Sequence, residues 1–308
     1  MKVIFFGTPH FAAEILQFLV ENKIQIVAVI TKPDKPKGRS GTPVPTPVKE
    51  VAQSLSLPFF QPPIVSDPSF ASTFQNFNPD LFIVVAYGEI LKQHLLDMPR
   101  KGCINVHASL LPKYRGAAPI QHSILNGDTK TGITIMHMAK KMDAGDIITM
   151  AEVPIGPDDI FPEVEKRLCE ASKPTLLRVI HEIEAGTATR TPQNHDLATL
   201  APKIELEDCL IDWKKPAQVI HNLVRAVTPA PGAWCMFQVQ GEPKRLKIYK
   251  TALEPEKQGT PGTLLSYGPQ GIFVACGKDT LKIIELQLEG KKRMSAEEFT
   301  RGLKIEHL

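Results

Sequence analysis

The first thirty residues place the strongest constraint on the fold. The apolar run Val3–Phe6 ends at once in a glycine turn at Gly7. Apolar side chains then recur at helical spacing at Phe11, Ile15, Phe18 and Leu19. The β-branched stretch Ile24–Ile30 follows. A strand, a tight turn, a helix and a second strand make a βαβ unit, which predicts a parallel sheet.

The same alternation continues to about residue 185. The uninterrupted apolar run Leu81–Ala86 is typical of a strand that is buried on both faces. Further strands are predicted at 103–107, 132–138 and 147–153, and helices at 117–125 and 162–185. Pro174 is expected to kink or split the last helix, which Gly186 should end.

The chain changes character after this helix. Residues 189–206 are polar and rich in Thr and Pro, which predicts a linker between a first domain, 1–188, and a second, 207–308. After a helix near 216–227, short strands are predicted at 234–239, 246–253, 272–276 and 281–288, separated by Gly and Pro turns. We therefore expect an α/β chain, in which a Rossmann-like parallel-sheet domain is followed by a small OB-like β-barrel.

The charge is divided unevenly between these domains. Residues 1–202 hold 20 Lys and Arg against 20 Asp and Glu, whereas residues 203–308 hold 16 against 13. The whole net charge of +3 therefore lies in the last third of the chain. A basic excess in one domain favours a polyanionic partner such as a nucleic acid.

The composition and the cysteine pattern exclude several classes of protein. No segment approaches the roughly 18 continuous apolar residues of a membrane helix, and the N-terminal apolar run is too short for a signal peptide. The five cysteines are odd in number, widely spaced and without a C-x-x-C pair, which argues against disulfides and zinc. We expect a cytoplasmic monomer with buried free thiols and no metal.

The glycine turn after the first strand invites a dinucleotide-binding interpretation. That fingerprint needs the spacing G-x-G-x-x-G, but Pro9 and Ala12 occupy the second and third glycine positions. The acidic residue expected about 20 residues later is also absent from Val27–Ile30. A structural turn is the better interpretation.

Asn105 and His107 are the first candidate catalytic residues. They lie two apart in a predicted strand, so their side chains project from the same face, near the carboxyl end where open α/β sheets bind ligands. An amide and an imidazole can both donate hydrogen bonds to a carbonyl oxygen that develops negative charge. The alternative is two satisfied polar residues at the end of a strand.

Asp143 is the third candidate. Its carboxylate, in a glycine-containing loop, can reach an imidazole and favour the protonated form of His107, or accept the proton that an attacking amine must lose. Asp146 is a rival for this role, and plain turn chemistry is the other interpretation.

Several sequence blocks resemble those of the methionyl-tRNA formyltransferase family, in the family's order and spacing. They are Phe6–Phe11, Val85–Gly88, Asn105–Pro112, Arg115–Ile120, Asp143–Asp146, Ile211–Trp213 and Gly290–Ser295. The resemblance covers essentially the whole chain. The Asn-x-His block with Ser-Leu-Leu-Pro is specific for formyl transfer from 10-formyltetrahydrofolate, but it does not choose the acceptor.

The resemblance implies an activity and a set of site residues. The activity is transfer of the formyl group of 10-formyltetrahydrofolate to the α-amino group of methionyl initiator tRNA, for translation initiation. Asn105, His107 and Asp143 match the catalytic trio. The folate pocket is expected to include Ser109, Leu110, Leu111 and Pro112, with backbone and apolar walls from Tyr87, Gly88, Ile90 and Leu91.

Two basic regions are candidates for tRNA binding. Residues 32–49 are expected to form a long loop, and the resemblance implies that it enters the tRNA acceptor end, with Lys37 and Arg39 as contacts. In the second domain Arg245 and Lys247 share one face of a strand and can reach phosphates. Lys291–Arg293 is a further basic cluster, and a solvated surface is the alternative for each region.

Two other functions compete with tRNA formylation. A formyltransferase or folate hydrolase with a small-molecule acceptor needs neither a basic loop nor a basic second domain. A nucleic-acid-binding protein without activity has no use for an intact Asn105, His107 and Asp143.

Overall fold

The computed structural model describes residues 1–36, 41–239, 242–254 and 259–302. These residues form two compact units, and each unit gathers several stretches of the chain. The first unit comprises 1–119, 130–154 and 165–202, and the second comprises 120–129, 155–164 and the chain from 203 onward. Among the described residues, no helix is both long enough and apolar enough to cross a membrane.

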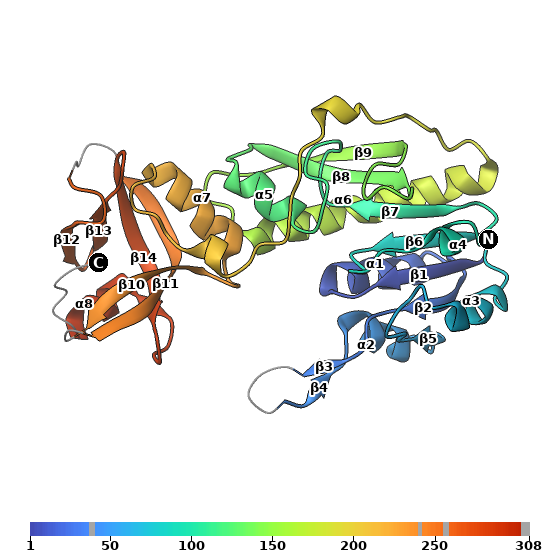
Figure 1. Ribbon diagram of the computed structural model, residues 1–308, viewed down its shortest axis with the longest axis horizontal. Coiled ribbons are helices and arrows are strands. Elements are labelled where there is room, and N and C mark those ends of the chain that lie inside the picture. Colours follow the sequence, from blue (N-terminus) through green and yellow to red (C-terminus); the bar gives the residue numbers. More distant parts are fainter. Residues whose placement is uncertain (37–40, 240–241, 255–258, 303–308) are drawn as a thin grey trace. The chain divides into compact units, whose positions relative to one another are not determined.

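The first unit is built on a seven-stranded mixed sheet (Figure 1). The strands in spatial order are β5 (Phe59–Phe60), β2 (Ile26–Ile30), β1 (Val3–Gly7), β6 (Leu81–Val85), β7 (Cys103–His107), β8 (Lys130–His137) and β9 (Ile147–Pro154). The first five strands are parallel, as the N-terminal βαβ pattern predicts. Every residue of β1 and β6 is buried, which is the burial expected for a strand covered on both faces.

The last two strands depart from the parallel arrangement. Strand β8 runs antiparallel to β7, and β9 runs antiparallel to β8. Only residues 138–146 join β8 to β9, which is too short for the crossover that a parallel pair needs. This short connection carries Asp143.

The helices of this unit include several that the sequence pattern did not reveal. Helices are α1 (His10–Glu21), α2 (Pro47–Ser54), α3 (Pro68–Gln75), α4 (Gln93–Leu96) and the long α6 (Phe161–Ala185), whose first residues belong to the second unit. Helix α6 continues through Pro174, so the predicted split is wrong. An apolar core that contains Phe6, Phe74 and Phe82 lies against the sheet.

The predicted loop at 32–49 is also partly structured. Strands β3 (Lys35–Pro36) and β4 (Pro43–Val44) pair as a short antiparallel hairpin, and α2 begins at Pro47. The Thr46 hydroxyl accepts a hydrogen bond from the backbone N–H of Lys49 at 3.2 Å, which caps α2.

The second unit contains an antiparallel sheet that includes the four short strands predicted from the sequence. Its order is β10 (Ala233–Val239), β11 (Glu242–Glu254), β14 (Thr280–Leu288), β13 (Gly271–Ala275) and β12 (Leu264–Gly268), and β15 (Met294–Ser295) pairs with β14. The helices are α5 (Pro119–Leu125), whose first residue belongs to the first unit, α7 (Ala217–Val227) and α8 (Ala296–Gly302). Strands β12 and β15 and helix α8 are additions to the predicted elements.

Residues 189–201 belong to the first unit and pair with other parts of it. Thr191 pairs with Ile147, and Leu200 pairs with Arg115, each as an isolated bridge. A turn of 3-10 helix at His195–Leu197 lies between these bridges, and another at Glu207–Cys209 opens the second unit's main stretch. The predicted linker is therefore attached along much of its length.

Candidate active site

Asn105 and His107 lie on one face of β7 near its carboxyl end. The strand is held between parallel β6 and antiparallel β8, where Val84 pairs with Asn105 and Thr134 pairs with His107. Asn105 is half-buried, whereas the His107 side chain is only 6% exposed. The alternation of the strand thus brings the two predicted side chains together.

The His107 ring is fixed by a backbone carbonyl. Its Nε2 lies 2.9 Å from the carbonyl oxygen of Tyr114. Because a carbonyl can only accept, Nε2 carries the proton and donates it. Nδ1 therefore faces the other way, where the Asp143 Oδ2 lies 3.7 Å from it.

Asp143 reaches His107 from the β8–β9 connection. Its Oδ2 accepts a hydrogen bond from the backbone N–H of Gly116 at 2.9 Å. Its backbone has φ +50°, which non-glycine residues seldom adopt. In the described part of the chain Asp143, and not Asp146, lies within ion-pair distance of His107, so the geometry favours Asp143.

Two further buried residues support this loop, and the sequence interpretation did not include them as site residues. The Gln193 amide contacts the backbone of 143–145, and the Arg115 guanidinium contacts that amide. Arg115 belongs to one of the family-like blocks, which was the available signal. Gln193 lies in the predicted linker, and no sequence motif marked it as a site residue.

Ser109–Pro112 form a tight turn directly after β7. The Ser109 hydroxyl donates to the carbonyl oxygen of Lys113 at 2.7 Å. The Thr134 hydroxyl donates to the Ser109 carbonyl oxygen at 2.6 Å and accepts from the Leu111 N–H at 3.1 Å. This turn is therefore placed by β8 as well as β7, next to His107.

The segment after β6 lies at the same edge of the sheet. Tyr87 and Leu91 are 2% and 3% exposed and belong to the apolar core, so they can reach a ligand mainly through their backbone. Burial raises the pKa of Tyr87 above its usual range, and within the described residues its hydroxyl has no partner. Ile90 is 70% exposed, and a Cβ built on Gly88 meets no atom within 4 Å.

One ion pair ties the base of the β3–β4 hairpin to this segment, and a second lies within the base itself. Lys32 pairs with Glu89, and Lys49 pairs with Asp34. Two of the basic side chains near the predicted tRNA loop are thus already neutralised. Lys37 and Arg39 lie outside the described residues.

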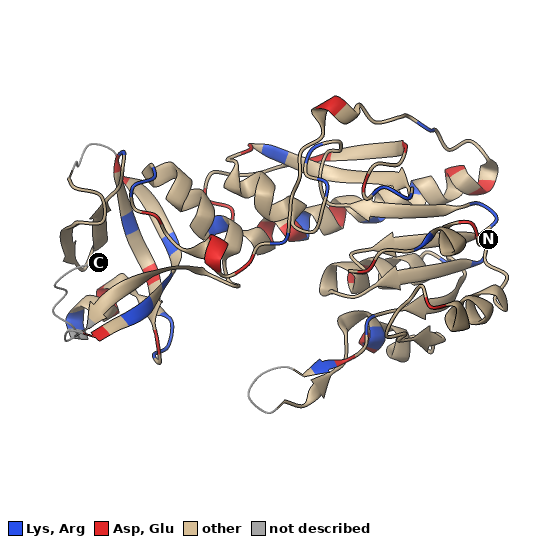
Figure 2. Ribbon diagram, in the orientation of Figure 1, with Lys and Arg blue, Asp and Glu red and all other residues tan. Residues whose placement is uncertain are grey.

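In the second unit, Arg245 and Lys247 share one face of β11, as the alternation predicts. Arg245 stacks on the Trp234 ring of β10 at 4.6 Å, and the Lys247 Nζ donates to the Pro231 carbonyl oxygen at 2.7 Å. The opposite face carries buried Leu246. Figure 2 shows further basic residues on the strands of this sheet.

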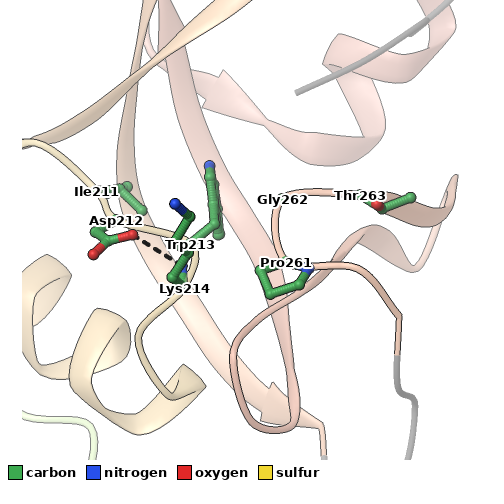
Figure 3. Close-up of a pocket in the computed structure, with 7 residues that line it drawn as sticks. All are labelled: Ile211, Asp212, Trp213, Lys214, Pro261, Gly262 and Thr263. Carbon is green, nitrogen blue, oxygen red and sulfur yellow. Dashed lines mark hydrogen bonds between the residues drawn. The ribbon is translucent and has the colours of Figure 1, made fainter.

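A cavity of about 480 Å³ lies elsewhere in the second unit (Figure 3). It is lined by Ile211, Asp212, Trp213, Lys214, Pro261, Gly262 and Thr263. The Asp212 Oδ1 accepts from the Lys214 N–H at 3.0 Å, which closes the turn at its rim. The cavity contains none of the predicted site residues.

The cysteines are all buried free thiols, as predicted. Burial raises the pKa of Cys103 and of Cys235 to about 12. Among the residues described, no three His, Cys, Asp or Glu side chains are grouped closely enough to hold a metal ion.

Comparison with known proteins identifies the family. The model of the formyl transferase family matches residues 1–180, and the model of the formyl transferase C-terminal domain matches residues 203–304. A protein of Protochlamydia amoebophila named methionyl-tRNA formyltransferase is 56% identical over 303 residues, which are 98% of this chain and 95% of that protein.

Solved structures share the fold at low sequence identity. HypX from Aquifex aeolicus, in complex with tetrahydrofolic acid, superposes with a TM-score of 0.67 at 17% identity. The match covers 99% of this chain and 48% of HypX, so this chain spans about half of that protein. An N-formyltransferase from Helicobacter canadensis, in complex with folinic acid and dTDP-3-aminofucose, gives a TM-score of 0.66 at 19% identity, over 92% of this chain and 99% of that one. The solved structures show the shared fold, and the two family models and the 56% identical relative show that the chain belongs to the formyl transferase family and, within it, to the methionyl-tRNA formyltransferases.

Proposed function

We propose that this protein transfers the formyl group of 10-formyltetrahydrofolate to the α-amino group of methionyl initiator tRNA. The name of the close relative supports this acceptor. The observation that carries the chemistry is the placement of Asn105 and His107 on one strand face, with Asp143 beside the His107 ring. We propose these three residues as the catalytic residues.

Asn105 and His107 are suited to bind the oxygen of the formyl group as it gains negative charge. The 3.7 Å between His107 Nδ1 and Asp143 is too long for a full hydrogen bond, so a protonated Nδ1 can donate to that oxygen. The Asn105 amide is half-buried on the same face of β7, and it can donate as well. One such donor typically contributes ~10²–10³ in rate.

Asp143 has two roles in this proposal. Its negative charge stabilises the protonated His107 ring, and its carboxylate accepts the proton that the attacking amine loses. A bond forms between the amine nitrogen and the formyl carbon, and the bond from that carbon to N10 breaks. N10 keeps the electron pair and takes up the proton that Asp143 accepted, directly or through water, which leaves tetrahydrofolate and formylmethionyl-tRNA.

The residues at the carboxyl ends of β6 and β7 fit a folate co-substrate, which supplies the formyl group. One observation supports the fit: the space around Gly88 is open, since a Cβ built there meets no atom within 4 Å. We propose that Ser109–Pro112 and the backbone of 87–91 hold the folate. HypX, which shares the fold, was solved with tetrahydrofolic acid.

We also propose that the tRNA contacts the basic residues of both units. Arg245 and Lys247 on β11 are candidates for phosphate contacts, and so are Lys37 and Arg39. In this proposal residues 1–188 are the catalytic domain, 189–206 the linker and 207–308 the tRNA-binding domain. The protein is expected to act as a cytoplasmic monomer.

A formyl-transfer assay tests the proposal directly. The protein is supplied with 10-formyltetrahydrofolate and either methionyl initiator tRNA or methionyl elongator tRNA, and formylmethionyl-tRNA is followed on an acid gel. We expect product with the initiator and little with the elongator. Tetrahydrofolate release without formylated tRNA would move the acceptor to a small molecule or water. Near-normal turnover by Asn105→Ala would refute the role of Asn105.

A further inference from the structure

One buried amide holds the loop that carries Asp143. The Gln193 Nε2 donates to the carbonyl oxygen of Asp143 at 3.0 Å and to that of Gly145 at 2.8 Å. The Gln193 side chain is only 6% exposed. Both amide hydrogens are thus used on two carbonyl groups of the same short loop.

The other end of this amide is held as firmly. The Gln193 Oε1 accepts from the Arg115 Nε at 3.2 Å and from its Nη2. Because a guanidinium can only donate and a carbonyl can only accept, the amide can have only this orientation. The Arg115 side chain is 4% exposed, and its Nη2 also donates to the His195 Nδ1 at 2.9 Å.

The residues on each side of Arg115 contact the catalytic groups. Tyr114 accepts from the His107 ring, and Gly116 donates to the Asp143 carboxylate. Residues 114–116 therefore fix both partners of the His107–Asp143 pair, and Gln193 ties the backbone of the Asp143 loop to the same three residues. Without Gln193, the Gly116 N–H would still bind the Asp143 carboxylate. The backbone of residues 143–145 would lose both hydrogen bonds from the Gln193 amide.

We propose that Gln193 is a positioning residue for formyl transfer. It fixes the 143–145 loop, including the φ of +50° at Asp143, so that the Asp143 carboxylate stays beside the His107 Nδ1. A non-glycine residue persists in that backbone conformation only where its surroundings hold it. The inference rests on the proposed roles of His107 and Asp143.

Gln193→Glu is the sharpest test because it preserves the size of the side chain. The carboxylate keeps its contact with Arg115 but loses both hydrogen bonds to the loop, since it has no hydrogen to donate. We expect kcat to fall ~10–10²-fold, because a shift of ~1 Å near the reacting atoms can cost ~10²-fold. The KM of each substrate and the affinity for tetrahydrofolate should stay close to those of the unmodified protein, whereas the Tm should fall because two loop carbonyl groups lose their hydrogen-bond donor.

Two further variants guard against misfolding. Gln193→Ala removes the same bonds without adding a charge, and it should lower kcat to a similar extent. Asn194→Ala is the matched control, because this exposed neighbour caps the turn at 195–197 by accepting from the Asp196 N–H and has no bond to the 143–145 loop. It should retain normal turnover.

A double-mutant cycle separates positioning from a purely structural role. If Gln193 acts through Asp143, Gln193→Ala should lower kcat by less than ~2-fold when Asp143→Asn is already present. Additive losses, or normal kcat in both Gln193 variants while Asp143→Asn is impaired, would overturn this inference alone. Normal kcat in Asp143→Asn would instead show that the proposed catalytic role of Asp143 is wrong, and the inference would fall with it.

Discussion

Gly145→Ala tests how strictly the backbone positions the Asp143 loop. A Cβ at residue 145 would lie 1.8 Å from the carbonyl oxygen of His137, whereas real Cβ atoms essentially never approach other atoms closer than 3.0 Å. The obstructing atom belongs to the backbone of β8, which is paired on both sides. The loop must therefore move by about 1 Å or more.

This movement should reach the catalytic carboxylate. Asp143 is two residues away, and the same shift would disturb the hydrogen bond from Gln193 to the Gly145 carbonyl oxygen. A displacement of ~1 Å is expected to lower kcat ~10²-fold, equivalent to ~2.7 kcal/mol in the activation free energy. Crowding of this kind should also lower the free energy of unfolding by ~1–3 kcal/mol.

The assay measures initial rates of formylmethionyl-tRNA formation over a range of both substrates, with Tm and tetrahydrofolate binding recorded in parallel. Gly268→Ala is the control, because a Cβ built there meets no atom within 4 Å and its backbone φ is not positive. It should behave as the unmodified protein does. If Gly145→Ala kept normal kcat and Tm, the close approach of the two backbones would not determine the position of Asp143.

Three further predictions concern other parts of the molecule. Arg245→Ala should weaken tRNA binding and reduce by about 1 the slope of log affinity against log salt concentration, measured by binding titrations at several salt concentrations. Equal slopes in the two proteins would exclude a phosphate contact. Burial lowers the pKa of His221 below its ordinary value of 6.5, so the unfolded state takes up the proton first as the pH falls. The free energy of unfolding should therefore decrease as the pH drops below about 6.5, and denaturant titrations should show a shallower decrease for His221→Gln; an unchanged pH dependence would contradict this. The buried thiols, with the pKa of Cys103 raised to about 12, should react with a thiol reagent at pH 8 only after denaturation, and rapid labelling of the native protein would be the opposite result.

Local patterns in the sequence were sufficient to predict the strands that carry the site. The period of two along β7 puts Asn105 and His107 on one face, and the apolar run of β6 identifies a strand buried on both sides. These features depend on neighbouring residues, so they can be read from a single segment. The glycine-containing loop offered Asp143 and Asp146, and the family-like blocks then matched Asp143 to the catalytic trio.

The features that the sequence did not reveal depend largely on contacts between residues that are far apart in the sequence. Gln193 is polar and lies in a Thr- and Pro-rich stretch, which is typical of a linker, yet its partners are some 50 and 78 residues away. The direction of β8 and β9 follows from the strands with which they pair. The parallel pattern before them does not predict the change to antiparallel pairing. Pro174 is tolerated inside α6, where the surrounding helix continues without interruption.

The second unit is assembled from three separate stretches of the chain, and this limits how its parts can be exchanged between relatives. The Asn222 amide contacts the Leu125 carbonyl oxygen at 3.5 Å, and the Arg225 guanidinium contacts the Asp159 carbonyl oxygen at 2.9 Å. A chimaera that takes only residues 203–308 from another family member would leave both partners behind in the recipient sequence. Helix α7 would then be transplanted without the segments that it contacts, unless 120–129 and 155–164 were exchanged with it. A chimaera within this family should therefore exchange 120–129, 155–164 and 203–308 together rather than the C-terminal stretch alone.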